Sequence, residues 1–273
     1  MEPTSARLVY FSPTRTTERV LEAIAQGARA RETRRLDLTP PAAATDTFGV
    51  PAEELAIVGA PVYGGRIPPE AARRLRRVRG NLTAAVVVVV YGNRAYEDAL
   101  LELCDLVTER GFVPVAAGAF IGEHSFSTEA MPLAHGRPDA EDLRQAAAFG
   151  GRIREALELL GALDQLPMLP VPGSRPYKEW GPAGGVAPLT REAVCTLCGN
   201  CATACPTGAV AVEGAVRTDA GACILCCACV KNCPTAARVL EDEEMRRVMV
   251  WLSRHCAERK EPETYSLMEG VRR

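Results

Sequence analysis

Apolar residues in the first 160 positions alternate between two patterns, one typical of buried strands and one typical of amphipathic helices. Short apolar runs predict strands at Ala6–Phe11, Leu55–Gly59, Ala84–Tyr91 and Phe112–Phe120, and a weaker alternating run predicts an edge strand at Arg34–Leu38. Apolar residues spaced by three and four predict helices at Thr16–Arg31, Pro68–Val78, Tyr96–Arg110 and Ala140–Leu160. Strands that alternate with helices in this way predict an α/β domain with a doubly wound parallel sheet.

The pattern changes after residue 163, and we therefore expect a first domain at 1–163. Prolines and glycines dominate 164–190, which we interpret as a semi-rigid linker with Tyr177 and Trp180 as possible anchor points. A cysteine-rich domain follows at 191–240. A closing helix is expected from Glu241 to about Arg259, within a C-terminal region at 241–273 whose last dozen residues are polar and expected to be disordered.

The cysteines are concentrated in this third segment: nine of eleven lie between Cys195 and Cys233. Four of them, with a following proline, form the pattern C-x2-C-x2-C-x3-C-P, and the same pattern recurs 28 positions later. The first copy holds Cys195, Cys198, Cys201 and Cys205, and the second holds Cys223, Cys226, Cys229 and Cys233. Two copies in register predict two similar halves related by a pseudo-two-fold axis.

This spacing is typical of bacterial-type [4Fe–4S] sites, where three thiolates of one half and the fourth of the other half hold each cluster. The predicted ligands of one cluster are Cys195, Cys198, Cys201 and Cys233, and those of the other are Cys223, Cys226, Cys229 and Cys205. A zinc ribbon would leave the third cysteine of each half unused, and disulfides need an oxidising compartment. The repeat leaves Cys227 spare, although an exchange of ligands between Cys226 and Cys227 stays open.

Polar and glycine-rich loops follow three of the predicted strands at one edge of the sheet. Ser12–Thr17 carries four hydroxyls at the start of the first helix, where exposed amides and the helix dipole favour an anion such as phosphate. An ordinary N-cap would need only one of them. The loops Pro61–Pro68 and Tyr91–Tyr96 follow the third and fourth strands, and ligands of open α/β sheets bind beyond such strand ends.

Together these loops resemble those of the flavodoxins. Ser12–Thr17 is similar to the family's phosphate loop T/S-x-T-G-x-T, with Arg15 in place of glycine, and Gly92–Glu97 is similar to its G-D-x-x-Y-E segment. The resemblance implies a five-stranded sheet of order 2-1-3-4-5 that binds FMN, with Tyr96 stacking on the ring and Gly64-Gly65 near flavin N5. The residues it implies at the flavin are Ser12, Thr14, Arg15, Thr16, Thr17, Pro61, Val62, Tyr63, Gly64, Gly65, Tyr91, Gly92, Asn93 and Tyr96.

The order of the parts is similar to that of the bacterial and archaeal flavodoxin–ferredoxin fusion proteins, which implies a small α+β tandem-cluster ferredoxin domain after the linker. The segment 122–128 resembles the same group, and its His124 is a polar loop residue that could also serve the flavin. The function implied is electron transfer between FMN and two [4Fe–4S] clusters for redox protein partners such as a reductase or a ferredoxin-dependent acceptor.

Two other functions stay open. The chain could be an FMN-dependent reductase of a quinone, a nitro compound or a similar small acceptor, fed by its own ferredoxin domain. Alternatively, the clusters could only hold the fold, with no flavin in the first domain. The residues show no acid–base pair or nucleophile that would make a protein side chain catalytic, and no G-x-G-x-x-G fingerprint for direct NAD(P)H oxidation.

Composition narrows the setting without changing this interpretation. A hydrophobic content of 47% and a charged content of 24% are those of a soluble globular protein, and a net charge of −2 does not favour nucleic acid. Residues 1–5 do not resemble a signal peptide, and the apolar run Ala84–Tyr91 is too short to span a bilayer. We therefore expect a cytoplasmic protein and, because such clusters are oxygen-sensitive, an anaerobic or microaerobic host.

Overall fold

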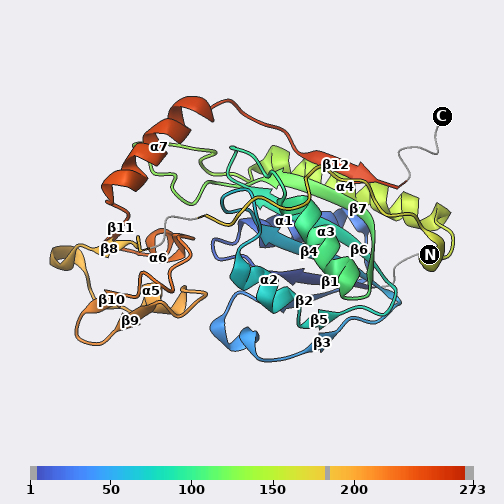
Figure 1. The fold of residues 1–273 in the computed structure, drawn as a ribbon, viewed down its shortest axis with the longest axis horizontal. Helices are drawn as coiled ribbons and strands as arrows, with labels where there is room; N and C mark the ends of the chain where they lie inside the picture. Colours follow the sequence, from blue (N-terminus) through green and yellow to red (C-terminus); the bar gives the residue numbers. More distant parts are fainter. Residues whose placement is uncertain (1–4, 182–184, 268–273) are drawn as a thin grey trace.

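The computed structural model describes residues 5–181 and 185–267, and Figure 1 shows an α/β unit joined to a smaller cysteine-containing module. The α/β unit contains β1 (Ser5–Tyr10), α1 (Thr16–Ala28), β2 (Glu32–Asp37), β3 (Phe48–Gly49), β4 (Glu54–Pro61), α2 (Pro69–Leu75), β5 (Val78–Arg79), β6 (Thr83–Tyr91), α3 (Ala99–Glu109), β7 (Phe112–Ile121) and α4 (Ala140–Leu159). The rest of the chain contains β8 (Leu189–Thr190), α5 (Asn200–Thr203), β9 (Val210–Val212), β10 (Val216–Thr218), α6 (Ala228–Lys231), β11 (Arg238–Val239), α7 (Glu243–His255) and β12 (Glu263–Ser266).

The main sheet has the order β12-β7-β6-β4-β1-β2. Within it, the five strands β2, β1, β4, β6 and β7 are parallel to one another. Counted along the chain, they have the expected order 2-1-3-4-5 of flavodoxin-like folds. Every residue of β4 and β6 is buried, as expected for central strands that are covered on both faces. The edge strand β2 alternates between exposed and half-buried residues, which agrees with its weak sequence pattern.

Helices cover both faces of this sheet. One apolar core lies under α1 and α4 and includes Leu21, Ile24 and Phe149, while the other lies under α2 and α3. Gly27 of α1 and Gly150 of α4 allow the first pair of helices to pack closely: a Cβ at Gly27 would lie 1.8 Å from the Ala147 carbonyl oxygen, and one at Gly150 would lie 2.0 Å from the Ile24 carbonyl oxygen. The crossing therefore requires glycine at both positions.

The sheet has one strand more than the five expected, and this corrects the expectation of a disordered tail. Residues 263–266 form β12, which pairs antiparallel with β7 from Glu263 opposite Ala119 to Ser266 opposite Ala116. The strand is polar and short, so its sequence lacks the apolar alternation that marks a strand. Pairing with the free edge of β7 satisfies the backbone groups that an unpaired edge would expose. The remaining residues, 268–273, lie outside the described part of the chain.

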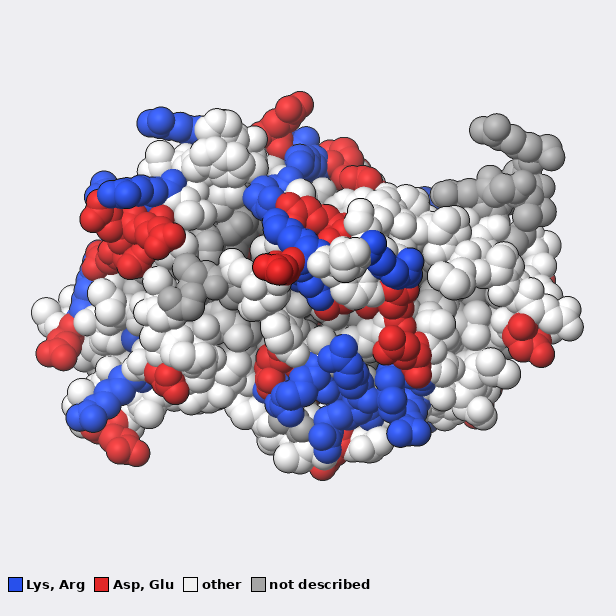
Figure 2. Space-filling model, viewed as in Figure 1, with Lys and Arg blue, Asp and Glu red and all other residues white. Residues whose placement is uncertain are grey.

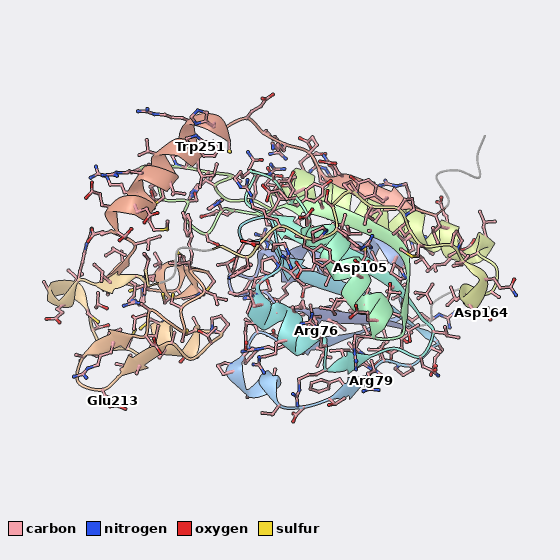
Figure 3. The ribbon with its side chains drawn as sticks, viewed as in Figure 1. Arg76, Arg79, Asp105, Asp164, Glu213 and Trp251 are labelled. Atoms are coloured by element: carbon pink, nitrogen blue, oxygen red, sulfur yellow. The ribbon has the colours of Figure 1, made fainter. Side chains whose placement is uncertain are left out.

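The proline-rich segment is anchored along α3. The buried carboxylate of Asp98 accepts hydrogen bonds from the backbone amides of Ser174 and Lys178, at 2.8 and 2.7 Å. Asp105, labelled on α3 in Figure 3, pairs with Arg175 and accepts a hydrogen bond from the hydroxyl of Tyr177. The segment is therefore fixed to the α/β unit over these residues, and Tyr177 is one of its anchors as expected.

Candidate cofactor sites

The two halves of the cysteine module have the same backbone conformation at equivalent positions. Three pairs of residues separated by 28 positions have positive φ angles: Leu197 and Leu225 at 52° and 54°, Gly199 and Cys227 at 81° and 55°, and Gly208 and Ala236 at 68° and 52°. The short helices α5 and α6 occupy equivalent positions too. The sequence repeat is therefore also a repeat of the fold, and each turn of the cysteine loops is made twice.

Four cysteines from both halves lie close together, and we call them the inner set: Cys205, Cys223, Cys226 and Cys229. Burial, with a smaller contribution from the neighbouring thiols of Cys229, Cys205 and Cys223, raises the pKa of the Cys226 thiol to about 12. Cys205 also raises the pKa of Cys223 and of Cys229. Cys205 comes from the first half, so thiols of both halves interact here.

The other four cysteines, Cys195, Cys198, Cys201 and Cys233, form the outer set. Cys201 is buried and interacts with Cys195, whereas Cys198 is exposed. Cys233 accepts a hydrogen bond from the backbone amide of Ala237 at 3.2 Å, which helps to lower the pKa of its thiol. The fourth cysteines of the two halves have matching contacts with a hydroxyl: Cys205 with Thr207 at 3.6 Å and Cys233 with Thr235 at 3.8 Å.

Cys227 occupies a position that glycine fills in the first half. It is buried and caps α6 with a left-handed backbone, as Gly199 caps α5. Burial raises the pKa of its thiol well above the usual value, with Cys226 and Cys229 nearby. By the repeat, Cys227 therefore matches the turn residue Gly199, and Cys226 matches the expected ligand Cys198.

A cavity of about 370 Å³ lies where the α/β unit meets the module and α7. Its α/β wall comes from the expected loops after β1, β4 and β6, through Thr14, Thr16, Pro61, Val62, Tyr63, Gly64, Tyr91 and Gly92. The loop after β7 adds His124 and Phe126. These loops follow the carboxyl ends of parallel strands, at the edge of the sheet where α/β proteins bind their ligands.

The loop before α1 has a left-handed backbone at Arg15, the residue that stands in the place of glycine in the phosphate-loop pattern. Arg15 is the N-cap residue with φ 63° and ψ 4°, in the left-handed region that glycine adopts freely. Its side chain points into solvent and pairs with Glu18 at 2.9 Å, with 75% of its surface exposed. The amides of Thr16 and Thr17 begin the helix and, in the described part of the chain, have no acceptor, so they could receive an anion.

Two side chains of this loop point elsewhere than into the cavity. The hydroxyl of Ser12 accepts a hydrogen bond from the amide of Glu18 at 3.1 Å, so Ser12 fixes the first turn of α1. Thr17 is fully buried, and its hydroxyl has no hydrogen-bond partner among the described residues. Of the expected hydroxyls, only those of Thr14 and Thr16 line the cavity, and they lie 3.5 Å from one another.

Three other residues expected at the flavin, Tyr96, Gly65 and Asn93, do not line this cavity. Tyr96 is buried, and its hydroxyl meets Glu263 at 2.7 Å and Tyr265 at 2.9 Å, under β12. Gly65 faces the side chain of Glu97, because a Cβ there would lie 1.8 Å from the Glu97 carboxylate. Asn93 is buried and donates from its amide to the carbonyl oxygens of Cys256 and Glu258, each at 2.7 Å.

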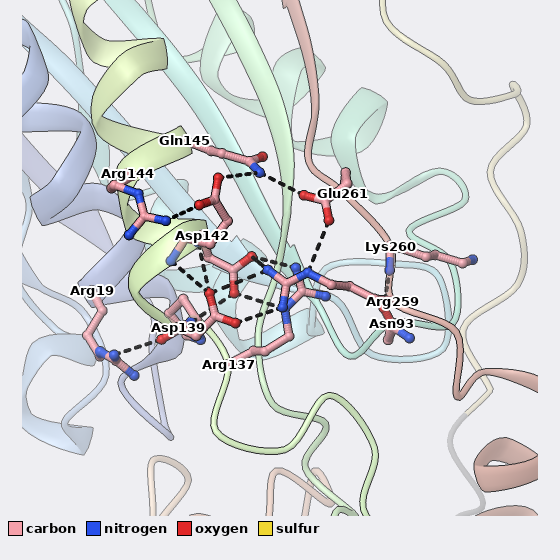
Figure 4. Close-up of polar contacts among 12 residues, drawn as sticks. Arg19, Asn93, Arg137, Asp139, Asp142, Arg144, Gln145, Arg259, Lys260 and Glu261 are labelled. Atoms are coloured by element: carbon pink, nitrogen blue, oxygen red, sulfur yellow. Dashed lines mark hydrogen bonds and ion pairs between the residues drawn. The ribbon is translucent and has the colours of Figure 1, made fainter.

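Tyr96 and Asn93 instead hold the segment 256–266, which we call the C-terminal clasp. Figure 4 shows Arg259 of the clasp between Asp139, Asp142 and Glu261, with distances of 2.7, 3.2 and 3.0 Å. Hydrogen bonds from Arg259 hold the pKa of Asp139 well below its usual value. The clasp runs from the end of α7 back to the sheet, so it fixes α7 beside the cavity.

The sequence interpretation missed the third wall of the cavity. Helix α7 contributes Met245, Val248, Trp251 and Leu252, and the second cysteine loop contributes Ile224 and Leu225. The spacing of these α7 residues by three and four is an amphipathic signal, but it does not say which surface the apolar face covers. Trp251, labelled in Figure 3, stacks on His255 with ring centroids 4.7 Å apart and remains half exposed at the rim.

His124 lies in the cavity wall as a neutral side chain. Its Nδ1 accepts a hydrogen bond from the amide of Phe126 at 3.1 Å, which assigns the ring proton to Nε2. Burial, together with the positive charges of Arg94 and Lys231, lowers the pKa of His124 to about 4. The imidazole therefore meets the cavity as a neutral donor at neutral pH.

The depressed pKa of His124 predicts a loss of stability in mild acid. Because an unfolded histidine titrates near pH 6.5 and the folded one near 4, the unfolded chain takes up a proton first as the pH falls. We expect the wild type to lose about 1 kcal/mol of stability through this group between pH 7.5 and 5.5. Urea unfolding of the wild type and His124→Gln at both pH values measures this, and an equal loss in the two proteins would contradict it.

Comparisons with known proteins agree with the cysteine pattern. A family model described as a 4Fe–4S binding domain matches residues 190–211, which contain the first four cysteines. A comparison with curated proteins found no match. In the described part of the chain, none of the helices combines the length and the apolar character that crossing a bilayer requires.

Among solved structures, similar ones include a flavodoxin from the domain Archaea, at 14% identity and a TM-score of 0.36, covering 56% of this chain and 99% of that one. A Streptococcus pneumonia TIGR4 flavodoxin has 18% identity and a TM-score of 0.37, covering 56% and 99%. The rubredoxin oxygen:oxidoreductase of Desulfovibrio gigas has 15% identity and a TM-score of 0.38, covering 57% of this chain and 36% of that one. Likenesses of this size leave the function to be argued from the residues of this chain.

The fold and the family match define a protein that binds [4Fe–4S] iron and has an α/β unit with the flavodoxin-like strand order. The α/β unit comes first in the chain, and the cysteine module follows it. Electron transfer is the chemistry that such an iron–sulfur module supports.

Proposed function

We propose that the chain transfers electrons between one FMN in the cavity and two [4Fe–4S] clusters, as an adaptor for redox protein partners. The observation that carries this proposal is the shared wall: Ile224 and Leu225, inside the second cysteine loop, line the same cavity as the loops after β1, β4 and β6. A flavin in the cavity would therefore lie beside the cluster of the inner set.

The cluster ligands that we propose are the two crossed sets. Cys205, Cys223, Cys226 and Cys229 would hold the inner cluster, and Cys195, Cys198, Cys201 and Cys233 the outer one. Cys226 and Cys229 are buried, and burial keeps their thiols protonated in the absence of metal. Cluster binding would then release protons, and its free energy would contribute to folding of the module.

The two halves of the module differ in how exposed their cysteine loops are, and this suggests a path for electrons through the module. Leu225 in the inner loop is 6% exposed, whereas its equivalent in the outer loop, Leu197, is 45% exposed. Val194 and Leu189 beside the outer loop are also exposed. We propose that a one-electron protein partner exchanges electrons at the outer cluster, and that the inner cluster connects it with the flavin.

The residues present fit a flavin. Thr14, Thr16 and the first amides of α1 would hold its phosphate, and Val62, Tyr63, Gly64, Tyr91 and Gly92 would line the ring. Gly92 lets His124 pack against the loop after β6, because a Cβ there would lie 2.4 Å from the His124 ring. Bound FMN would supply two-electron chemistry that can be divided into single electrons. The chain itself would position the ring, present the neutral His124 and cover one side with α7.

The test combines cofactor counting with a variant of the phosphate loop. Anaerobically purified wild type should hold about eight iron, about eight sulfide and one FMN per chain. Thr16→Asp should lose the FMN by charge repulsion and keep the iron, because an acid in the first turn favours the helix. Thr128→Asp, which places the same charge on an exposed loop residue, should keep both cofactors. Zinc in place of iron, or a Thr16→Asp protein that keeps its flavin, would contradict the proposal.

A further inference from the structure

A buried arginine in the cysteine module, Arg238, forms no ion pair with a carboxylate of the described residues. Arg238 is 3% exposed at the start of β11. In the described part of the module its acceptors are the hydroxyls of Thr190 and Thr218, at 2.6 and 2.8 Å, and the sulfur of Cys229 at 3.8 Å. Its Nε is buried without a partner. Burial of such a charge is costly unless an anion compensates it.

Cysteine sulfurs of the module lie near this guanidinium. Its contact is with Cys229 of the inner set, and its charge also lowers the pKa of Cys223 and Cys201. The two threonines hold the guanidinium from β8 and β10, so its position is fixed from three strands. The arrangement is therefore built to place one positive charge between the two cysteine sets, nearest to the inner one.

The repeat makes this charge asymmetric. The position equivalent to Arg238 in the first half, 28 residues earlier, is Val210, a buried apolar residue of β9. The outer set thus has no equivalent arginine at this position. Any effect of Arg238 must therefore distinguish the two clusters, although their ligand patterns are the same.

We propose that Arg238 raises the reduction potential of the inner cluster relative to the outer one, which holds a transferred electron next to the flavin cavity. This inference rests on the two-cluster function proposed above. Reduction adds one negative charge to a cluster, and burial of Cys226 and Cys229 by itself disfavours that charge and lowers the potential. A buried cation next to Cys229 stabilises the reduced form and offsets the effect of burial.

The experiment is an anaerobic redox titration of the full-length protein, with each cluster followed by its electron paramagnetic resonance. Arg238→Gln should lower one of the two one-electron potentials by at least about 59 mV, a tenfold change in the reduced-to-oxidised ratio at a fixed potential. The other potential should move less. Arg238→Lys, which keeps the charge, should restore most of the difference.

Arg217 provides the matched control, because it lies on β10 of the same module but is exposed. Arg217→Gln removes the same charge, yet solvent screening should leave both potentials nearly unchanged. Equal shifts of the two clusters in Arg238→Gln, or the same shifts in Arg217→Gln, would overturn the inference. If Arg238→Gln fails to assemble its clusters, Thr218→Val, which frees one side of the guanidinium, should shift the same potential by less, and no shift there would overturn it.

The titration separates this inference from the proposed function. A wild-type protein with only one cluster would fail the iron and sulfide count, and the function would fall before any variant is compared. A protein with both clusters and no response to Arg238 would leave the proposed function intact and remove only the role of Arg238.

Discussion

Replacement of Cys205 by serine is expected to empty the cluster of the second half of the module, although Cys205 lies in the first half. The thiol of Cys205 interacts with those of Cys223, Cys226 and Cys229, the other three members of the inner set. Serine is a poor ligand for iron in such a cluster, so the inner site should lose its iron. We expect iron to fall from about eight to about four per chain.

The identity of the lost cluster decides whether ligation is crossed. If Cys205 instead served its own half, Cys205→Ser and Cys201→Ser would remove the same cluster and leave identical paramagnetic spectra. We expect Cys205→Ser to match Cys226→Ser, and Cys201→Ser to differ from both. Cys227→Ser is the matched control, because Cys227 is buried in the same turn and occupies the position of Gly199. The Cys227→Ser protein should keep about eight iron per chain.

The sequence predicted the parallel sheet well because the signals are local, whereas the strand order was implied by the resemblance to flavodoxins. The residues of β4 and β6 are continuously apolar, and each strand is followed by a helix whose apolar residues recur at three and four positions. Handedness and connection rules then leave few arrangements of such units. The cysteine spacing is likewise local within each half, and the structure repeats the same positive φ angles in both.

The sequence failed where a residue's role depends on a distant segment. Tyr96 and Asn93 lie in a segment that resembles a flavin-binding loop. In the structure, Tyr96 is hydrogen-bonded to Glu263, and Asn93 is hydrogen-bonded to the backbone of residues 256–260. β12 carries no apolar alternation, so its pairing with β7 arises from the free edge of the sheet. The cavity also takes its walls from three parts of the chain, and no local pattern reports that Leu225 and Met245 face Thr16 across it.

Arg74→Met is expected to destabilise the protein by about 3 kcal/mol, because the side chain joins α2 to two other segments. Arg74 is 1% exposed, and its Nη1 donates to the carbonyl oxygens of Leu38, Thr39 and Pro40 at 2.6, 2.7 and 2.8 Å. Its Nη2 donates to the carbonyl oxygen of Pro206 at 2.5 Å, next to Cys205. Methionine would fill the space but leave these buried acceptors unpaired.

Arg73→Met is the control that separates burial from charge. Arg73 and Arg74 both pair with the carboxylate of Glu70, but Arg73 is exposed. Arg73 belongs to a group of arginines over α2 and β5 in Figure 2, with Arg76, Arg77 and Arg79. Its loss should cost less than about 0.5 kcal/mol, because exposed ion pairs contribute little. Urea unfolding of both variants with cofactors bound measures the difference, and equal midpoints would show that Arg74 does not hold the module to the α/β unit. If they differ as expected, Arg74 joins α2 to residues 38–40 and to Pro206, which adjoins the proposed cluster ligand Cys205.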